Sequence, residues 1–265
     1  MGTYLDEILD FHRYESRGDV RSLDVLVEKA GEVEPARGFN KALVNSPANE
    51  MGVIAEIKKR SPSRGELASG LVPSSISQEY EEGGASALSV LTDNQYFGGS
   101  SVDLSEARAT CNLPVLRKDF TVDLRDICDA RIMEADAVLL IVAALDDYEL
   151  KDFIALSNEL GLDALVEVHD EEEVERALMI GAEIIGVNQR DLQTFEVDTD
   201  RALRIGKLLP SEVTKVAESG IDSPDDIPKL HAANYRAVLV GEYLVQSENR
   251  AERVAGLRTA AIPSS

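Results

Sequence analysis

A carboxylate and an ammonium group stand two residues apart at Glu56 and Lys58, near the end of the apolar run Val53–Lys58. Because side chains alternate between the two faces of a strand, these charges would share one face. The run then breaks into Ser61-Pro62-Ser63-Arg64-Gly65, a loop whose hydroxyl and backbone N–H groups suit a phosphate. This stretch predicts a site where an acid, a base and an anion can meet.

Most of the other apolar runs also end on polar residues. The clearest pairs are Lys118/Asp119, Glu167/His169, Asn188/Arg190 and Glu218/Ser219. In a parallel barrel, residues in such positions converge on one mouth. Crowding raises the pKa of carboxyl groups and lowers that of neighbouring lysines, which suits groups that exchange protons near neutral pH. The pattern therefore predicts an acid and base site built from several strands.

Each candidate also has a structural interpretation. Lys118 and Glu167 have apolar neighbours, where burial without a partner is costly, and this favours a functional role. Glu56 and Glu218 could instead be structural partners of the lysines. Asn188 could simply satisfy backbone groups at a strand end.

Two further kinds of candidate are weaker. Arg190 is followed by Asp191, so an exposed ion pair is as good an interpretation as ligand binding. The histidines His12, His169 and His231 lack the spacing of metal ligands, and we predict no metal site.

Glycines follow the last two apolar runs, in Glu218-Ser219-Gly220 and Val240-Gly241-Glu242. A glycine lets an anion approach the backbone and a following helix adds N–H donors, as occurs after strands seven and eight of many (β/α)8 barrels. The alternative is that these glycines only form tight turns. Glu242 would repel a phosphate, so we expect its side chain to point away from the site.

The elements that must position these residues form a repeating series. Segments with helical periodicity separate eight apolar runs, at Val53–Lys58, Ala87–Thr92, Pro114–Lys118, Ala137–Val142, Ala164–Val168, Ile184–Asn188, Lys215–Glu218 and Ala237–Gly241. Such alternation predicts an α/β fold, a (β/α)8 TIM barrel whose strands are buried on both faces. A doubly wound open sheet is the alternative, but no GxGxxG follows the first run.

About fifty residues precede the first run. Residues 3–13 and 20–30 have helical spacing of their apolar side chains. We expect residues 1–50 to form an N-terminal helical extension that covers one face of the barrel, within a single domain of residues 1–265.

Composition narrows the possible functions. The 265 residues are 44% hydrophobic, which supports a full core, and no apolar run approaches the length of a membrane span. The net charge of −22 argues against binding to nucleic acid or to an anionic membrane. The N-terminus does not read as a signal peptide, and two cysteines, Cys111 and Cys128, cannot form a disulfide framework. We expect a cytoplasmic enzyme.

The acidic balance, with 18 Arg and 9 Lys, suggests a halophilic protein, and an ordinary acidic cytosolic enzyme is the alternative.

Six ordered motifs carry a family resemblance. They are Ala55-Glu56-Ile57-Lys58 with Ser61-Pro62-Ser63, Tyr96-Phe97-Gly98-Gly99-Ser100, Leu116-Arg117-Lys118-Asp119-Phe120, Leu165-Val166-Glu167-Val168, Gly186-Val187-Asn188-Gln189-Arg190-Asp191-Leu192 and Ala217-Glu218-Ser219-Gly220-Ile221. With these motifs the chain resembles the indole-3-glycerol-phosphate synthase family from Phe39 essentially to its end. The resemblance implies a cofactor-free enzyme of tryptophan biosynthesis. Its substrate would be 1-(2-carboxyphenylamino)-1-deoxyribulose 5-phosphate, cyclised to indole-3-glycerol phosphate with loss of carbon dioxide and water.

The resemblance also implies roles for the candidate residues. Lys118 would be the general acid and Glu167 the general base, and Lys58 would meet the substrate carboxylate and share in proton transfer. The groups that position these residues and complete the polar ring would be Glu56, Asn188 and Glu218. From its place at the end of the sixth run, and not from the resemblance, we also count Arg190 as a candidate for substrate binding. The phosphate would lie near Ser61, Ser219, Gly220 and Gly241, and the anthranilate ring against Phe97 and Phe120.

Two other functions fit the same scaffold. Phosphoribosylanthranilate isomerase is one, but that family uses a Cys and an Asp, and no Cys ends a strand here. A non-catalytic phosphate-binding barrel is the other, and loss of Lys118 or Glu167 would be its mark. Both residues are present. The expected partner is a small phosphorylated substrate, and association with other tryptophan-pathway enzymes stays open.

Overall fold

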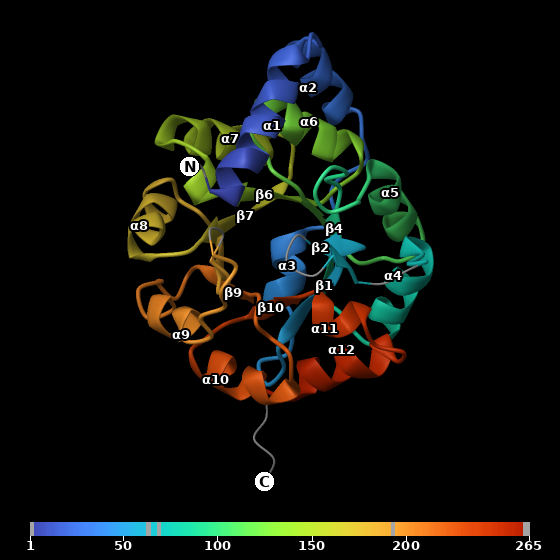
Figure 1. Cartoon of the computed structure of the whole chain (residues 1–265), viewed down its shortest axis with the longest axis vertical. Helices are drawn as coiled ribbons and strands as arrows, with labels where there is room; N and C mark the ends of the chain where they lie inside the picture. Colours follow the sequence, from blue (N-terminus) through green and yellow to red (C-terminus); the bar gives the residue numbers. More distant parts are fainter. Residues whose placement is uncertain (1–2, 62–64, 68–69, 192–193, 262–265) are drawn as a thin grey trace.

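Eight parallel strands close into a barrel in the computed structural model, which describes residues 3–61, 65–67, 70–191 and 194–261 (Figure 1). The strands are β1 (Gly52–Ile57), β4 (Ala87–Leu91), β5 (Val115–Lys118), β6 (Ala137–Ile141), β7 (Asp163–Val168), β8 (Ile184–Asn188), β9 (Thr214–Glu218) and β10 (Ala237–Val240). Each strand pairs with its neighbour in sequence, and β1 also pairs with β10 to close the ring. The predicted (β/α)8 barrel is confirmed, and all eight predicted runs are strands.

Alternation along each strand separates an inner from an outer core. In β7, Leu165 belongs to the cluster inside the barrel, whereas Val166 and Val168 belong to the cluster beneath the surrounding helices. Glu167 therefore follows Leu165 on the inner side, one step nearer the carboxyl end. The same alternation places charged side chains from several strands above the apolar centre of the barrel.

The helices form an outer ring around the strands (Figure 1). They are α4 (Pro73–Glu82), α5 (Ser101–Ala109), α6 (Leu124–Ile132), α7 (Asp147–Glu159), α8 (Glu171–Met179), α9 (Arg201–Ile205), α10 (Ile227–Ala232), α11 (Glu242–Val245) and α12 (Arg250–Thr259), with short 3-10 turns η1 (Val142–Ala144) and η2 (Pro224–Asp226). Several begin with a side-chain cap. Asp146, for example, accepts from the backbone N–H groups of Tyr148 and Glu149 at the start of α7. No described helix is long and apolar enough to span a bilayer.

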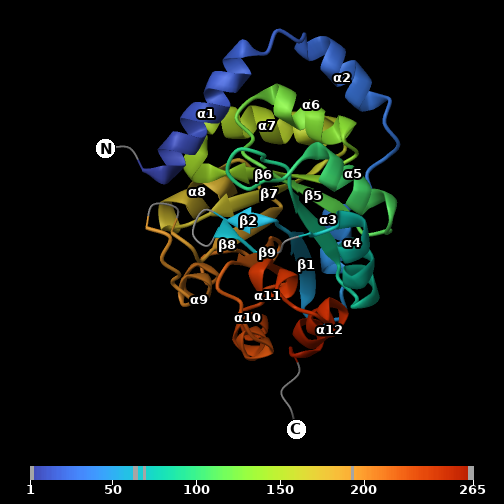
Figure 2. The same cartoon turned by 45° about the vertical axis from the view of Figure 1, so that its right-hand side comes forward.

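The N-terminal extension divides between both ends of the barrel. Its helices are α1 (Tyr4–Gly18), α2 (Leu23–Gly31) and α3 (Phe39–Val44). Phe39 and Leu43 of α3 join the inner core and close the amino-terminal end, whereas α1 reaches the opposite mouth and α2 packs on α6 (Figure 2). The extension therefore reaches two openings: α1, a helix of 15 residues, lies at the cavity mouth, and the six-residue α3 lies at the opposite end.

The loop after β1 carries a small antiparallel pair that the sequence did not indicate. It joins β2 (Arg60–Ser61) to β3 (Gly65–Glu66). Pro62 and Ser63 of the predicted phosphate loop lie outside the described residues.

Candidate active site

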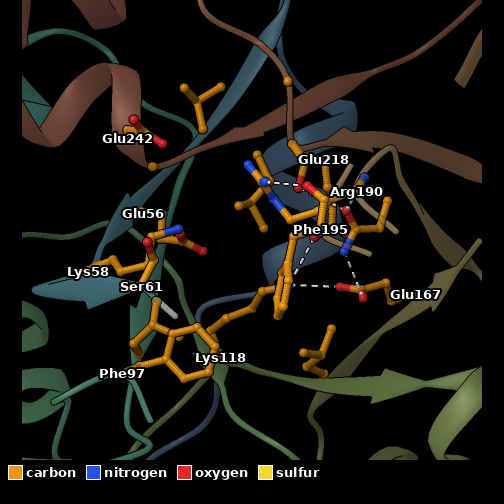
Figure 3. Close-up of a pocket in the computed structure, with 18 of the residues that line it drawn as sticks. Glu56, Lys58, Ser61, Phe97, Lys118, Glu167, Arg190, Phe195, Glu218 and Glu242 are labelled. Carbon is orange, nitrogen blue, oxygen red and sulfur yellow. Dashed lines mark hydrogen bonds and ion pairs between the residues drawn. The ribbon is translucent and has the colours of Figure 1, made fainter. Parts of the chain in front are cut away.

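A cavity of about 390 Å³ opens at the carboxyl ends of the strands. Glu56, Lys58 and Ser61 stand on one side of it, and Glu167, Arg190 and Glu218 on the other (Figure 3). Strand alternation and strand order together bring these distant residues into one space.

Lys118 at the end of β5 is the centre of the polar ring. Its Nζ donates to Glu167 Oε2 and to Glu218 Oε2, each at 2.9 Å. Burial lowers the pKa of Lys118, but the carboxylates of Glu167, Glu218 and Glu56 outweigh burial and raise it. The expectation of a lowered lysine pKa is therefore wrong here, because the charges nearest to Lys118 are carboxylates and not other lysines.

The two carboxyl groups bound to Lys118 have different pKa values. Burial raises the pKa of Glu218 to about 7, and the nearby charge of Glu167 adds to this effect. Burial also acts on Glu167, but Lys118 and the donors around it outweigh burial and lower its pKa. One carboxyl group is thus kept ionised, and the other can hold a proton near neutral pH.

Gly186 of β8 provides the space that Glu218 occupies. A Cβ at this position would overlap Glu218 Oε1 and lie 3.2 Å from Leu165 Cδ1. Glu218 Oε1 is buried and makes no hydrogen bond among the described residues. The carboxyl group therefore has room on this side but no partner.

A chain of hydrogen bonds orients Glu167 from the β8 side. Asn188 Nδ2 donates to Glu167 Oε1 at 3.0 Å. The amide oxygen of Asn188 in turn accepts from Ser219 Oγ at 2.8 Å and from the Arg190 backbone N–H at 3.0 Å. Asn188 is thereby fixed in one orientation and holds Glu167 in place.

Glu56 and Lys58 form a second charged pair. Lys58 Nζ lies 2.6 Å from Glu56 Oε1, as their shared strand face predicts. A Cβ on Gly241 would lie 2.5 Å from that same oxygen. Gly241 therefore gives room to Glu56, in addition to lining the cavity.

One wall of the cavity is apolar. The rings of Phe97 and Phe120 lie 6.4 Å apart between centroids and are tilted by 38°. Leu139 and Ile141 of β6 line the same cavity together with Tyr4, Leu5 and Ile8 of α1. A flat aromatic group can be held between these surfaces.

The loop after β9 has an unusual backbone. Ser219 and Gly220 both have positive φ, at 65° and 67°. A Cβ on Gly220 would overlap Val197, so glycine is required here both for its conformation and for space. Gln189 Nε2 donates to the Ser219 carbonyl at 2.7 Å and holds this turn against the cavity.

A polar cluster attaches α1 to the mouth of the barrel. His12, Asp93 and Asp119 present ligand atoms within 4.8 Å of one another, a grouping that their sequence spacing does not reveal. These atoms already have protein partners. His12 Nε2 lies 2.9 Å from Asp93, and Asp119 binds Thr92 and Arg117. The contact between His12 and Asp93 holds the N-terminal helix over the aromatic wall, with the His12 ring 5.3 Å from that of Phe120.

Comparison with known proteins identifies the chain. The family model for indole-3-glycerol phosphate synthase matches residues 10–257. The indole-3-glycerol phosphate synthase of Paenarthrobacter aurescens is 47% identical over 97% of this chain and 96% of its own length. That of Chlorobium chlorochromatii is 46% identical over 91% of this chain and 95% of its own length. The chain belongs to the indole-3-glycerol phosphate synthase family.

Solved structures of other proteins share the fold of this indole-3-glycerol phosphate synthase family member. Thiamine phosphate pyrophosphorylase from Pyrococcus furiosus superposes with a TM-score of 0.57 at 16% identity, over 79% of this chain and 94% of its own. N-acetylmannosamine-6-phosphate 2-epimerase from Clostridium perfringens gives 0.57 at 15% identity, over 72% and 86%. At such identities the likeness supports the barrel alone.

All of the residues predicted for the indole-3-glycerol phosphate synthase site line the cavity. They are Lys118, Glu167, Lys58, Glu56, Asn188, Glu218, Ser61, Phe97, Phe120, Arg190, Ser219, Gly220 and Gly241. Glu242 lines it too, against the expectation that it points away, because α11 begins at this residue directly beside the mouth.

Sequence reasoning missed a second set of lining and supporting residues. Tyr4, Leu5, Ile8 and Phe195 reach the cavity of this indole-3-glycerol phosphate synthase family member from outside the barrel strands. The helical periodicity of residues 3–13 predicts a helix with one apolar face, but it does not tell which part of the protein that face contacts.

Proposed function

We propose that Lys118 and Glu167 are the general acid and the general base of the indole-3-glycerol phosphate synthase reaction in this chain. That reaction converts 1-(2-carboxyphenylamino)-1-deoxyribulose 5-phosphate to indole-3-glycerol phosphate, carbon dioxide and water. It is a carboxy-lyase step of tryptophan biosynthesis. The observation that carries the assignment is the position of the Lys118 ammonium between a carboxylate with lowered pKa and a carboxyl group with raised pKa.

Ring closure needs a group that stabilises the negative charge developing on the ketone oxygen. When the ring carbon attacks the ketone, electrons move onto the ketone oxygen, and a buried ammonium can neutralise this oxygen and give it a proton. Lys118 stays protonated until that charge develops, because carboxylates surround it. Carbon dioxide then leaves, and its bonding electrons restore the aromatic ring.

Dehydration needs a base as well as an acid. The new hydroxyl leaves as water while a proton is removed from the neighbouring carbon, which forms the double bond of the indole. Glu167 is ionised and oriented for this removal, and Glu218 can hold a proton near neutral pH. The three groups can therefore pass protons among themselves without solvent.

The two anionic ends of the substrate would be bound at different places. We assign the substrate carboxylate to Lys58, which Glu56 orients, with Arg190 as a further contact. The phosphate is assigned to the mouth beside Ser61, Ser219, Gly220 and Gly241, where Gly220 permits close approach to the backbone. The anthranilate ring would lie against Phe97 and Phe120.

The direct test is to incubate the pure protein with the substrate and to follow indole fluorescence. We expect turnover without added metal or cofactor, and a kcat reduced by about 10²–10⁴-fold when Lys118 is replaced by Ala. A wild-type protein that folds but produces no indole-3-glycerol phosphate would refute the proposal. Conversion of phosphoribosylanthranilate to 1-(2-carboxyphenylamino)-1-deoxyribulose 5-phosphate would instead indicate the isomerase.

A separate proposal concerns the domain organisation, the compartment and the partners of the enzyme. We propose that residues 1–265 form one domain, in the cytoplasm, and that the enzyme works with other enzymes of the tryptophan pathway. The two cysteines are buried and unpaired, as suits a reducing compartment. The charge of −22 and the excess of Arg over Lys support adaptation to high salt.

A further inference from the structure

His169 lies between two carboxylates, directly beside the proposed base. It follows the end of β7, and its side chain is 11% exposed. Its Nδ1 lies 3.0 Å from Glu173 Oε2, on α8. Its Nε2 lies 3.4 Å from Glu167 Oε1 and, although buried, makes no hydrogen bond among the described residues. The imidazole thus has one firm partner and one close anion.

Glu173 is held firmly in the first turn of α8. Its Oε2 also accepts from the backbone N–H of His169 at 2.7 Å. Its own backbone N–H donates to the side chain of Asp170, the N-cap residue, at 2.9 Å. The direction of the imidazole ring is therefore set by the start of a helix.

The two carboxylates decide the charge of the ring. A neutral imidazole has one N–H, so one of its nitrogens would turn a lone pair toward a carboxylate oxygen. An imidazolium presents an N–H to each side. Burial lowers the pKa of His169, but Glu167 and Glu173 outweigh burial and raise it to about 10. Lys118 acts on the other oxygen of Glu167.

We infer that His169 is a positioning residue, an imidazolium maintained by Glu173 that keeps Glu167 ionised and in place. The inference rests on the proposed role of Glu167. His169 is not among the residues that line the cavity, whereas Lys118 is. When Lys118 gives its proton to the substrate, Glu167 Oε2 loses the positive charge of the neighbouring Lys118 ammonium. The charge of His169 stays and preserves the base for the dehydration step.

The kinetic test uses His169→Gln, which keeps a neutral donor, and Glu173→Gln, which removes the anion that maintains the charge. Glu172→Gln is the matched control, because Glu172 is exposed in the same helical turn. In both test variants we expect kcat at pH 7 to fall on the order of tenfold, with KM within about twofold. The acidic limb of the kcat profile should move up by roughly one pH unit, because Glu167 loses a neighbouring positive charge.

The second measurement is independent of activity. The chain has three histidines, so ¹⁵N spectra of the imidazole groups can be assigned by comparison with His169→Gln. We expect both ring nitrogens of His169 to be protonated at pH 7.5 in the wild type, and one of them to lose its proton in Glu173→Gln. A neutral ring in the wild type would overturn the inference, as would test variants whose kcat and pH profile match the control.

The two proposals fail in different ways. A wild type without turnover would refute the proposed function and leave the spectra to decide the charge of His169. If His169→Gln unfolds, Glu173→Gln carries the test, with its melting temperature compared with that of Glu172→Gln.

Discussion

Replacing Gly186 by Ala tests whether the Glu218 carboxyl group must occupy its present place. The added Cβ would overlap Glu218 Oε1, so the carboxyl group must move. The bond from Lys118 Nζ to Glu218 Oε2, now 2.9 Å, would then be lost or distorted. A hydrogen bond to a charged group contributes about 1.5–3 kcal/mol. At about 1.4 kcal/mol for each factor of ten, kcat should fall roughly 10- to 150-fold.

The same substitution should also cost some stability, but too little to unfold the chain. Overpacking a core costs about 1–3 kcal/mol, which corresponds to a loss of a few degrees in Tm for a chain of this size. Gly256 of α12 is the control, because a Cβ there would meet only Pro224 Cγ, at 3.8 Å. Gly256→Ala should leave kcat unchanged and raise stability by roughly 0.5–1 kcal/mol.

A double-mutant cycle shows whether the effect passes through Glu218. Formation of indole-3-glycerol phosphate is measured by fluorescence for Gly186→Ala, for Glu218→Ala and for the double variant. If Gly186 acts through Glu218, adding Gly186→Ala to Glu218→Ala should change kcat little. A single variant with kcat within twofold of the wild type, or losses that multiply in the double variant, would refute the reasoning.

The remaining predictions concern the acid and base, the phosphate, pH and salt. Lys118→Ala and Glu167→Gln should each reduce kcat by about 10²–10⁴-fold with circular dichroism unchanged, and normal kcat in either would contradict its role. Gly220→Asp should raise KM and the directly measured substrate Kd before Tm falls, and unchanged affinity would place the phosphate elsewhere. The pKa of His169 is raised to about 10, so the native state keeps a proton that the unfolded state loses above about pH 6.5. The free energy of unfolding in urea should therefore fall from about pH 7 to 10. His169→Gln should flatten that fall. With a net charge of −22, Tm should rise from low to molar potassium chloride while KM also rises, and a flat or falling Tm would reject adaptation to salt.

The barrel and its polar ring could be predicted because strands that are buried on both faces have sequences of short apolar runs. Lys118 and Glu167 each interrupt such a run at its carboxyl end, and the closed strand order then brings them within 2.9 Å of each other. The register of a barrel decides this distance, and the alternation of side chains along each strand decides which of them point inward.

The misses have a common physical cause. Phe39 and Leu43 close the barrel from a helix of only six residues, too short for its periodicity to stand out. His12 meets Asp93 from a helix outside the barrel, and no local pattern specifies where such a helix docks. The pKa of Lys118 was misjudged for the same reason, since it depends on which charges the fold places nearby.

The pairing of β1 with β10 has a consequence for how the enzyme is made. Val53 pairs with Val238, so β1 cannot complete its pairing on this side until β10 has been synthesised. Until then Glu56 lacks the neighbouring Gly241, and the edge of β1 is open to other chains. A pairing so distant in sequence is a slow step in folding. Nascent or truncated chains that end before β10 should therefore be inactive and prone to aggregate, and activity should appear only when the ring closes.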